Sequence, residues 1–370
     1  MAFTFPDPQT SRFDFLPARP RITKSPNLTW LMAIVLAMSP VACQQTSEHS
    51  PQTLYYFTWS DYVGPNLIEE FERQTGAKVV VDTFGSNEEL LAKLQSGATG
   101  YDVAVPSDFM VAIMMKLSLL AELDLASIPN ADLLLERLQH LPFDPGHRYS
   151  IPYLWGTVGI GYDSSVIAIP PDSWDALWDP RYKGRISMLN DQREVFGTAL
   201  RSIGASINSR EPAVIEQAKR KLLQQKSLVK AYTSENYDQL LASGEVMLAH
   251  GWGGAVARAA VHRPSIRYVI PKEGGTIWSD CLVVLRSSRN KALAMRFVNY
   301  LLDRQVAAQT TNRLRFASSN REAKALVTPE LQKNPAVYPP DSVFDRLEWM
   351  EDLGEALRVY DRGWTELKLR

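Results

Sequence analysis

The sequence predicts an α/β protein with two lobes, and three observations support this prediction. The length of 370 residues suggests two domains of ordinary size. Predicted strands and helices alternate with short connections from residue 54 onward, which favours a mainly parallel sheet with right-handed crossovers. A long extended apolar run over residues 149–162 then interrupts the alternation, as a crossover into a second lobe would.

The first lobe is predicted from periodicity and helix signals. Pro65 suits a first helical turn and Gly76 a helix end, and Ser86 with Glu89 forms a capping box. We predict strands over residues 54–59, 78–84 and 101–105, and helices over 65–76, 88–95 and from about 111.

The second lobe repeats the alternation. We predict strands over 185–189, 227–232 and 245–250, and helices over 191–203, 212–224 and 237–243. Residues 271–276 read as a turn, and the strand 277–285 is expected to return to the first lobe. A helix over 289–302 and a helical tail over 344–369 complete the chain.

These elements predict a first lobe of residues 53–156 with 279–324 and a second lobe of residues 157–278 with 325–370. Ligands of such sheets bind beyond the carboxyl ends of the strands. We therefore expect residues 59–62 and 107–109 to lie on the same edge of the first sheet.

The N-terminal stretch has the layout of a secretory signal. Basic residues at positions 19, 21 and 24 precede an apolar run over 28–38, which is too short for a comfortable transmembrane helix. A small residue directly before Cys43 is similar to a bacterial lipoprotein cleavage box. We predict a signal peptide over 1–43 with Cys43 lipidated, and a tether over 44–52; cleavage near Ala42 and an uncleaved anchor are the alternatives.

Composition and motifs exclude several function classes. A net charge of −1 gives no basis for binding nucleic acid or an anionic membrane surface. The sequence has no HExxH, GxxxxGK[ST] or GxSxG motif, and its five His show no metal-ligand spacing. We therefore predict neither catalysis, nor a metal, nor a cofactor.

Two of the four candidate binding groups combine carboxylates with rings or with each other. Trp59, Asp61 and Tyr62 follow the first strand, and rings beside a carboxylate suit an organic cation. Asp191 and Glu194 share a helix face and could hold one ammonium between them. The structural alternatives are a core Trp with a turn Asp, and a capping box.

The other two groups lie near predicted strand ends. Trp252 has glycines on both sides, at 251 and at 253–254, which let a ligand or a backbone approach closely; the alternative is a Trp packed under a glycine turn. Trp278 and Asp280 point to one face of a strand. An Asp in an otherwise apolar strand is costly to bury without a partner, so Asp280 either binds a ligand or forms an internal salt bridge to an Arg.

From about Leu54 to the C-terminus, the chain resembles the bacterial periplasmic polyamine-binding proteins, the spermidine/putrescine receptors of ABC importers. The resemblance rests on five stretches, which are residues 59–62 (WSDY), 149–156 (YSIPYLWG), 174–178 (WDALW), 193–196 (REVF) and 271–275 (PKEGG). It implies a type II periplasmic binding protein fold, in which each lobe is a mixed sheet flanked by helices and the ligand cleft lies between the lobes.

The resemblance also implies roles for individual residues. Asp191 and Glu194 match the pair that holds a terminal amine, and Asp280 matches the carboxylate of a second amine. The other matching positions supply rings, an acidic neighbour and small polar contacts, and they are Trp59, Asp61, Tyr62, Ser107, Phe109, Ser234, Trp252, Trp278 and Phe316.

Three positions depart from the family pattern. Phe109 and Phe316 stand where the family often has Tyr, and Met350 stands where a Gln tends to bond one end of the ligand. These departures leave open which polyamine is preferred.

The resemblance implies a periplasmic, monomeric receptor that works with membrane permease subunits and is anchored if Cys43 is lipidated. A receptor of the same fold for thiamine, an opine or iron, a sensory module, and an enzyme are the alternatives.

Overall fold

The structure is a computed structural model that describes residues 52–62, 64–97 and 100–369, without the side chains of Asp61 and Pro65. Residues 49–370 form one compact unit. The predicted signal peptide, its Cys43 and the tether up to residue 51 lie outside the described residues.

One sheet runs through the described chain in the order β2-β1-β3-β9-β4-β7-β5-β6, with β8, β10 and β11 paired beside this path. Its strands are β1 (Thr53–Trp59), β2 (Lys78–Phe84), β3 (Val103–Ala104), β4 (Ser150–Asp163), β5 (Ile186–Met188), β6 (Val229–Tyr232), β7 (Leu248–Trp252), β8 (Ile266–Val269), β9 (Gly275–Val284), β10 (Ala317–Ser318) and β11 (Leu347–Trp349).

Helices flank the sheet on both sides. They are α1 (Pro65–Thr75), α2 (Asn87–Gln95), α3 (Asp108–Lys116), α4 (Gln192–Ser202), α5 (Pro212–Gln225), α6 (Tyr237–Ser243), α7 (Gly253–His262), α8 (Lys291–Leu301), α9 (Arg304–Leu314), α10 (Pro329–Gln332) and α11 (Leu357–Leu369). Short 3-10 turns, among them Ser60–Tyr62 and Trp174–Trp178, connect the elements.

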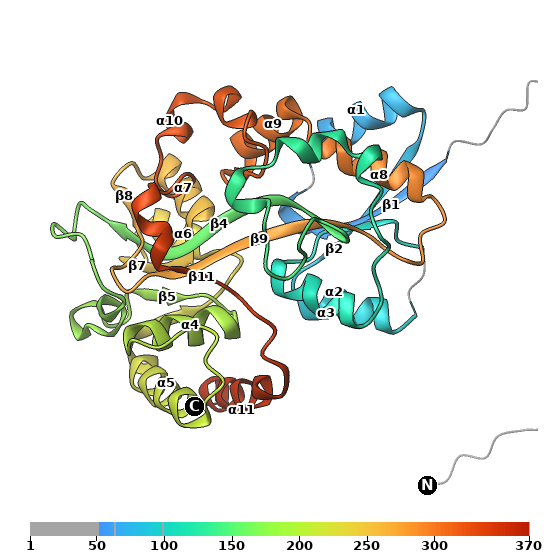
Figure 1. Cartoon of the computed structure of the whole chain (residues 1–370). Helices are drawn as coiled ribbons and strands as arrows, with labels where there is room; N and C mark the ends of the chain where they lie inside the picture. The colour runs from blue at the N-terminus through green and yellow to red at the C-terminus, as the bar shows by residue number, and fades with distance from the viewer. Residues whose placement is uncertain (1–51, 63, 98–99, 370) are drawn as a thin grey trace, which may run out of the picture. The chain divides into compact units, whose positions relative to one another are not determined.

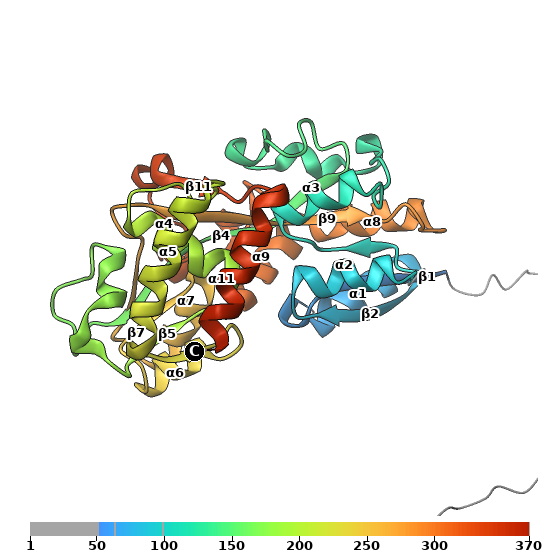
Figure 2. The same ribbon diagram turned by 90° about the horizontal axis from the view of Figure 1, so that it is seen from below.

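The long strands β4 and β9 join two groups of elements (Figure 1). Their antiparallel pairing extends from Ser150 opposite Val283 to Thr157 opposite Ile277. On one side, β9 pairs with β3 of the first group, and on the other, β4 pairs with β7 of the second. The same two groups are separate when the molecule is seen from below (Figure 2). The assignment of lobe boundaries at 156/157, 278/279 and 324/325 stays a prediction.

Side chains alternate between the two faces of the first group's sheet, and at β1 both faces are packed against other side chains. Tyr56 of β1 packs edge-on against Phe297 of α8 at 5.0 Å, whereas the next residue, Phe57, packs against Phe84 at 4.9 Å. Helices α1 and α8 therefore cover one face, and α2 and α3 supply Leu90, Met110 and Met114 to the cluster around Phe57. This strand ends at Trp59, as predicted.

In the second group, α4 packs against α5 and α11, while α6 and α7 pack against each other and against β4. Phe196 of α4 meets Tyr360 of α11 at 5.1 Å. Helix α4 begins after Asp191, whose side chain accepts the backbone N–H of Glu194 at 3.0 Å. Asp191 therefore caps α4 and fixes where it starts, whereas the carboxylate of Glu194 accepts a hydrogen bond from Thr276.

Several predicted elements have other bounds. The strand predicted over 101–105 pairs only at Val103–Ala104, and the following helix begins at Asp108 rather than near 111. The strand predicted over 245–250 begins at Leu248 and runs through Trp252. Five elements, α7, β8, α9, β10 and α10, were not predicted.

The tail predicted as helix over 344–369 is wrong in its first half. Residues 347–349 form β11, which pairs in parallel with β9, and the helix begins only at Leu357. Gly354 has a positive φ of 55°, a conformation that interrupts a right-handed helix. Residues 347–349 therefore form a strand because they pair with a free edge of β9, although their apolar pattern is typical of a helix.

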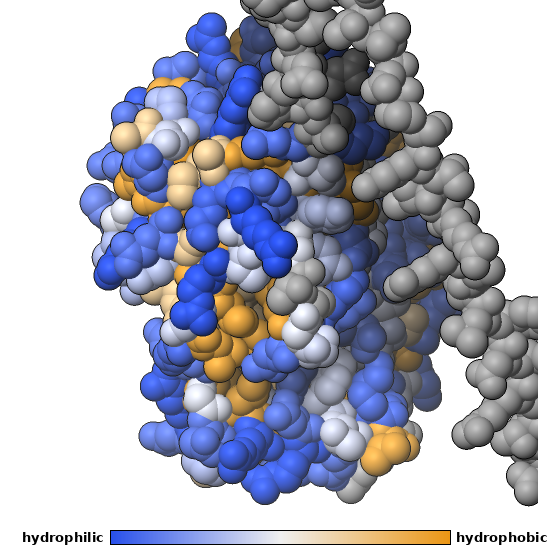
Figure 3. Space-filling view, turned by 90° about the vertical axis from the view of Figure 1, so that its right-hand side faces the viewer, coloured by the Kyte–Doolittle hydropathy of each residue, from blue (hydrophilic) through white to orange (hydrophobic). Residues whose placement is uncertain are grey.

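Within the described residues, no helix is both long enough and apolar enough to cross a membrane. Figure 3 shows one face of the molecule, where hydrophilic side chains dominate and hydrophobic ones gather in a band. Cys281 is a buried free thiol.

Candidate ligand-binding site

Asp280 is the centre of the candidate site. It lies in β9, is 5% exposed, and receives two hydroxyl hydrogen bonds from separate segments of the first group. Tyr62 donates to Oδ2 at 2.5 Å and Ser107 donates to Oδ1 at 2.7 Å. The turns after β1 and β3 therefore meet at one carboxylate, as expected for one edge of the sheet.

The carboxylate of Asp280 has hydroxyl partners rather than a cation. No Arg, Lys or His side chain of the described residues forms an ion pair with it, so the internal salt bridge considered from the sequence is wrong. Burial raises the pKa of Asp280 to about 6, although the bonds from Ser107 and Tyr62 act in the opposite direction. A buried carboxylate held this way is poised to accept a cation.

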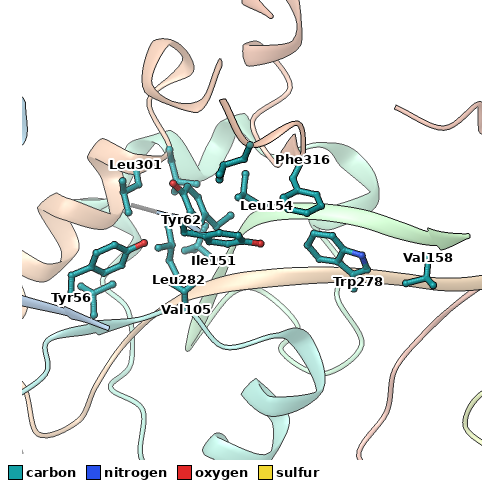
Figure 4. Close-up of a cluster of buried hydrophobic side chains, with 14 of the residues drawn as sticks. Tyr56, Tyr62, Val105, Ile151, Leu154, Val158, Trp278, Leu282, Leu301 and Phe316 are labelled. Atoms are coloured by element: carbon teal, nitrogen blue, oxygen red, sulfur yellow. The ribbon is translucent and has the colours of Figure 1, made fainter. Parts of the chain in front are cut away.

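Aromatic residues lie on the segments that meet at Asp280. Trp278, two residues before Asp280, packs edge-to-face against Phe316 with ring centres 5.2 Å apart (Figure 4). Phe316 in turn lies 6.4 Å from the ring of Tyr62. The indole N–H of Trp278 is buried and has no partner in the structure. Rings arranged beside a carboxylate favour a ligand that is both cationic and apolar.

Two glycines make room for these rings. Gly156 of β4 pairs with Trp278, and a Cβ there would lie 2.7 Å from the indole ring. Gly254 has the same relation to Phe316, where a Cβ would lie 2.3 Å from the ring. The close approach predicted next to Trp252 is thus confirmed. At Gly253 the approaching group is the backbone oxygen of Ala336, 2.1 Å from where a Cβ would lie, and at Gly254 it is the ring of Phe316.

The remaining residues of the first candidate group lie nearby. Trp59 is half-buried, its ring is 4.6 Å from that of Phe84, and its indole N–H is buried without a partner. The side chain of Asp61 lies outside the described residues, so its predicted place beside the rings is untested. The Trp59 side chain packs partly as a core residue, as the structural alternative proposed.

Asp191 and Glu194 lie at the start of α4 in the second group. Glu194 is 4% exposed and accepts a hydrogen bond from Thr276 of β9 at 2.8 Å. Burial, and then the charge of Asp191, raise the pKa of Glu194 well above its usual value. Burial also raises the pKa of Asp191. Burial of both carboxyls thus favours their protonated forms relative to free carboxyls.

Arg193 connects this pair to the first group. Its guanidinium lies 6.0 Å from the ring of Phe109 and 5.9 Å from that of Tyr360, and it donates to the backbone oxygen of Glu351 at 2.9 Å. Phe109 is therefore at the contact between the two groups of elements. Met350, the residue before Glu351, is 7% exposed.

Trp252 and Ser234 have more peripheral contacts. Trp252 is half-buried and its ring lies 6.1 Å from that of Tyr237. Ser234 accepts the backbone N–H of Asn190 at 3.0 Å, which fixes the loop before Asp191. No hydrogen bond joins either side chain to Asp280 among the described residues, so the structure brings them to the second group only.

Four further residues near the candidate site were not predicted from the sequence: Glu88, Asn87, Asp108 and Thr276. Asn87 donates to the hydroxyl of Ser107 at 3.1 Å and accepts its backbone N–H at 3.0 Å, so it positions a partner of Asp280. Burial and the charges of Asp191 and Asp361 raise the pKa of Glu88. Of these residues, only Asp108 could have been predicted from the sequence, because it lies between two candidate site residues, Ser107 and Phe109.

The described residues contain no group of three or more His, Cys, Asp or Glu side chains arranged to hold a metal ion. What the site offers is a set of buried carboxylates, hydroxyl donors and ring faces. Such groups can bind and orient an organic cation.

The comparisons with known proteins agree with this chemistry. The family model described as bacterial extracellular solute-binding protein matches residues 66–339. The spermidine/putrescine-binding periplasmic protein of Escherichia coli is 36% identical over 340 residues, which cover 90% of this chain and 97% of that protein.

Solved structures show the same fold. The spermidine/putrescine ABC transporter substrate-binding protein PotD from Streptococcus pneumoniae superposes with a TM-score of 0.77 at 31% identity, covering 86% of this chain and 99% of that one. The TpPotD lipoprotein of Treponema pallidum gives a TM-score of 0.79 at 30% identity, covering 86% and 100%. The predicted two-lobed periplasmic binding protein fold is thus confirmed.

Proposed function

Because the chain belongs to the bacterial extracellular solute-binding protein family, we propose that it is the substrate-binding receptor of an ABC importer and that its ligand is a polyamine, spermidine or putrescine. The observation that carries the proposal is Asp280, a buried carboxylate among aromatic rings whose partners are hydroxyls. The names of the relatives support the ligand class.

The proposed binding mode divides the ligand between the two lobes. One ammonium lies at Asp280 and another at Asp191 and Glu194, while the rings of Trp278, Phe316 and their neighbours cover the methylene chain. Each ammonium loses its water on entry, which is tolerated only with paired carboxylates. Ring faces add about 0.5–2 kcal/mol each through cation–π attraction.

The complete proposed ligand-binding set is that predicted from the sequence: Trp59, Asp61, Tyr62, Ser107, Phe109, Asp191, Glu194, Ser234, Trp252, Trp278, Asp280 and Phe316. The distance between the carboxylates on opposite lobes sets the length of the amine that can pair with both. An amine of the wrong length leaves a buried charge unpaired, which discriminates more strongly than a missing methylene does.

Closure of the two lobes around the ligand is proposed to produce the form that the permease recognises. The connections β4 and β9 are the elements about which the lobes would turn. In this role the protein makes and breaks no bond, is monomeric, and acts in the periplasm, with lipidated Cys43 as its membrane anchor.

A titration of the purified full-length protein tests the proposal. The protein is unfolded and refolded to remove any ligand, and tryptophan fluorescence and calorimetry are followed against putrescine, cadaverine, spermidine and spermine. Micromolar or tighter binding of one of them, about −8 kcal/mol, is the expected result. Absence of binding to all four, with binding of thiamine or an opine, would overturn the polyamine assignment and leave the fold untouched.

A further inference from the structure

Asp108 is a buried carboxyl group that the binding mode above does not use. It is the first residue of α3, lies between Ser107 and Phe109, and is 1% exposed. Its Oδ1 accepts the backbone N–H of Phe109 at 2.7 Å, and its Oδ2 accepts that of Ser279 at 3.4 Å. No cationic side chain of the described residues forms an ion pair with it. A carboxylate in such surroundings is costly unless a cation is supplied.

Asp108 is tied to the site through the backbone. Ser107 and Asp280 form an antiparallel bridge, so the residues that follow and precede them, Asp108 and Ser279, are also neighbours. Asp108 and Asp280 therefore flank the same short contact between α3 and β9. A substitution at Asp108 changes the charge next to Asp280 without removing a hydroxyl that bonds Asp280.

The charges of α4 also act on Asp108. Arg193 favours its ionised form, and Asp280 of β9 opposes it. In return, the charge of Asp108 disfavours ionisation of Glu194 and of the Cys281 thiol of β9. Of these four groups, Arg193 alone is a cation.

Glu88, Asp108, Asp191, Glu194 and Asp280 contribute five negative charges when ionised, and Arg193 contributes one positive charge, which leaves a net −4 among these described side chains. A ligand with three ammonium groups neutralises more of that charge than a diamine does. A diamine therefore leaves more carboxyls that must keep their protons.

Resting on the function proposed above, we propose that Asp108 is a specificity-determining residue, which makes the cleft favour a polyamine with three or more amines over a diamine. Asp108 is a positioning residue that acts through the field at Asp280 and Glu194. Burial raises the pKa of Asp108 to about 8, so its carboxyl is mainly protonated at neutral pH before the ligand binds. A third ammonium nearby lowers that pKa, and the proton leaves Asp108 for the buffer.

The test compares spermidine with putrescine on the full-length wild-type protein and on Asp108→Asn, a variant of equal size. Calorimetry at pH 7 in two buffers of different ionisation heat gives both affinity and the number of protons released. We expect Asp108→Asn to weaken spermidine binding about tenfold, to change putrescine binding less than about threefold, and to release fewer protons with spermidine.

Asp82→Asn is the matched control, since it removes one charge from the first group at a half-buried surface residue paired with Lys93. It should leave the ratio of the two affinities unchanged. If Asp108→Asn does not fold, Asp108→Thr replaces it. Equal weakening of both ligands, or unchanged proton release, would overturn the role of Asp108 while the polyamine receptor stands. A wild-type protein that binds neither amine overturns the receptor proposal itself.

Discussion

The hydroxyl of Tyr62 donates a hydrogen bond of 2.5 Å to the carboxylate of Asp280, although the two residues are 218 positions apart. This contact joins the turn after β1 to the long strand β9. It holds the carboxylate in one orientation and lowers its pKa against the larger effect of burial.

Asp280→Asn should weaken binding of every polyamine by about 3 kcal/mol, roughly a hundredfold, because an ammonium then faces a buried amide instead of a carboxylate. Calorimetry on the refolded protein measures this loss. Asp172→Asn, at a side chain 79% exposed, is the control and should bind as the wild type does. Affinities within about twofold of the wild type would place Asp280 outside the ligand site.

Glu194→Gln should weaken binding by about 2–3 kcal/mol, because one of the two carboxylates proposed to hold the terminal amine is lost. The variant should still fold, since the amide can accept the hydrogen bond that Thr276 donates to Glu194. Glu245→Gln, which changes an exposed residue of the same lobe, is the matched control. Equal affinities of the two variants would contradict the assignment of Glu194.

Gly156→Ala should reduce affinity about tenfold although the residue touches no ligand charge. Its new Cβ would meet the Trp278 ring at 2.7 Å, so the indole must shift away from Phe316. Tryptophan fluorescence and a binding titration measure the two effects together. Gly85→Ala is the control, because the nearest atom to its new Cβ lies at 3.5 Å. A variant with wild-type affinity would show that the ring position does not matter for binding.

The ligand-free protein should lose stability as the pH rises from about 6.5 to about 8. Burial raises the pKa of Asp108 from 3.8 to about 8, so the folded chain holds a proton in this window that the unfolded chain has released. Stability then falls by about 1–2 kcal/mol, or a few degrees in melting temperature. The buried His147 and His250 have lowered pKa values, and their usual value of 6.5 puts their contribution below this window.

Melting curves of the ligand-free protein at several pH values check this prediction. Asp108→Asn should flatten the dependence, and a saturating amine should oppose it, since a cation favours the ionised carboxyl. A wild-type melting temperature that rises between pH 6.5 and 8 would be the opposite of the expected result.

Local sequence patterns were sufficient to predict the bounds of an element where its own residues determine where it begins and ends. The apolar alternation of β1, Pro65 at the start of α1 and Gly76 at its end gave bounds that the structure confirms to within a residue or two. The Asp191 cap was predicted for the same reason, since a capping side chain bonds a backbone group three residues away.

Local sequence patterns were insufficient to predict an element whose structure depends on contact with a segment far away in the sequence. Residues 347–349 are a strand only because β9 offers them a free edge. Helix α3 begins about three residues earlier than predicted, directly after Ser107, whose hydroxyl bonds Asp280 of β9 instead of capping the helix. The role of Asp108 was missed for a related reason. Its sequence neighbours resemble an ordinary helix start, and its burial results from contact with β9, which is distant in the sequence.

The sequence by itself determined the α/β order of elements, the two-lobed fold class and the chemical types in the site, because periodicity, caps and carboxylate–aromatic spacing are properties of short segments. Tertiary structure alone decided that Tyr62, Ser107 and Asp280 meet, that Phe316 packs on Trp278, and that Asp108 lies beside them without a cation. Hydrogen bonds between residues more than a hundred positions apart, and the pKa values set by their burial, exist only after the sheet has brought those segments together.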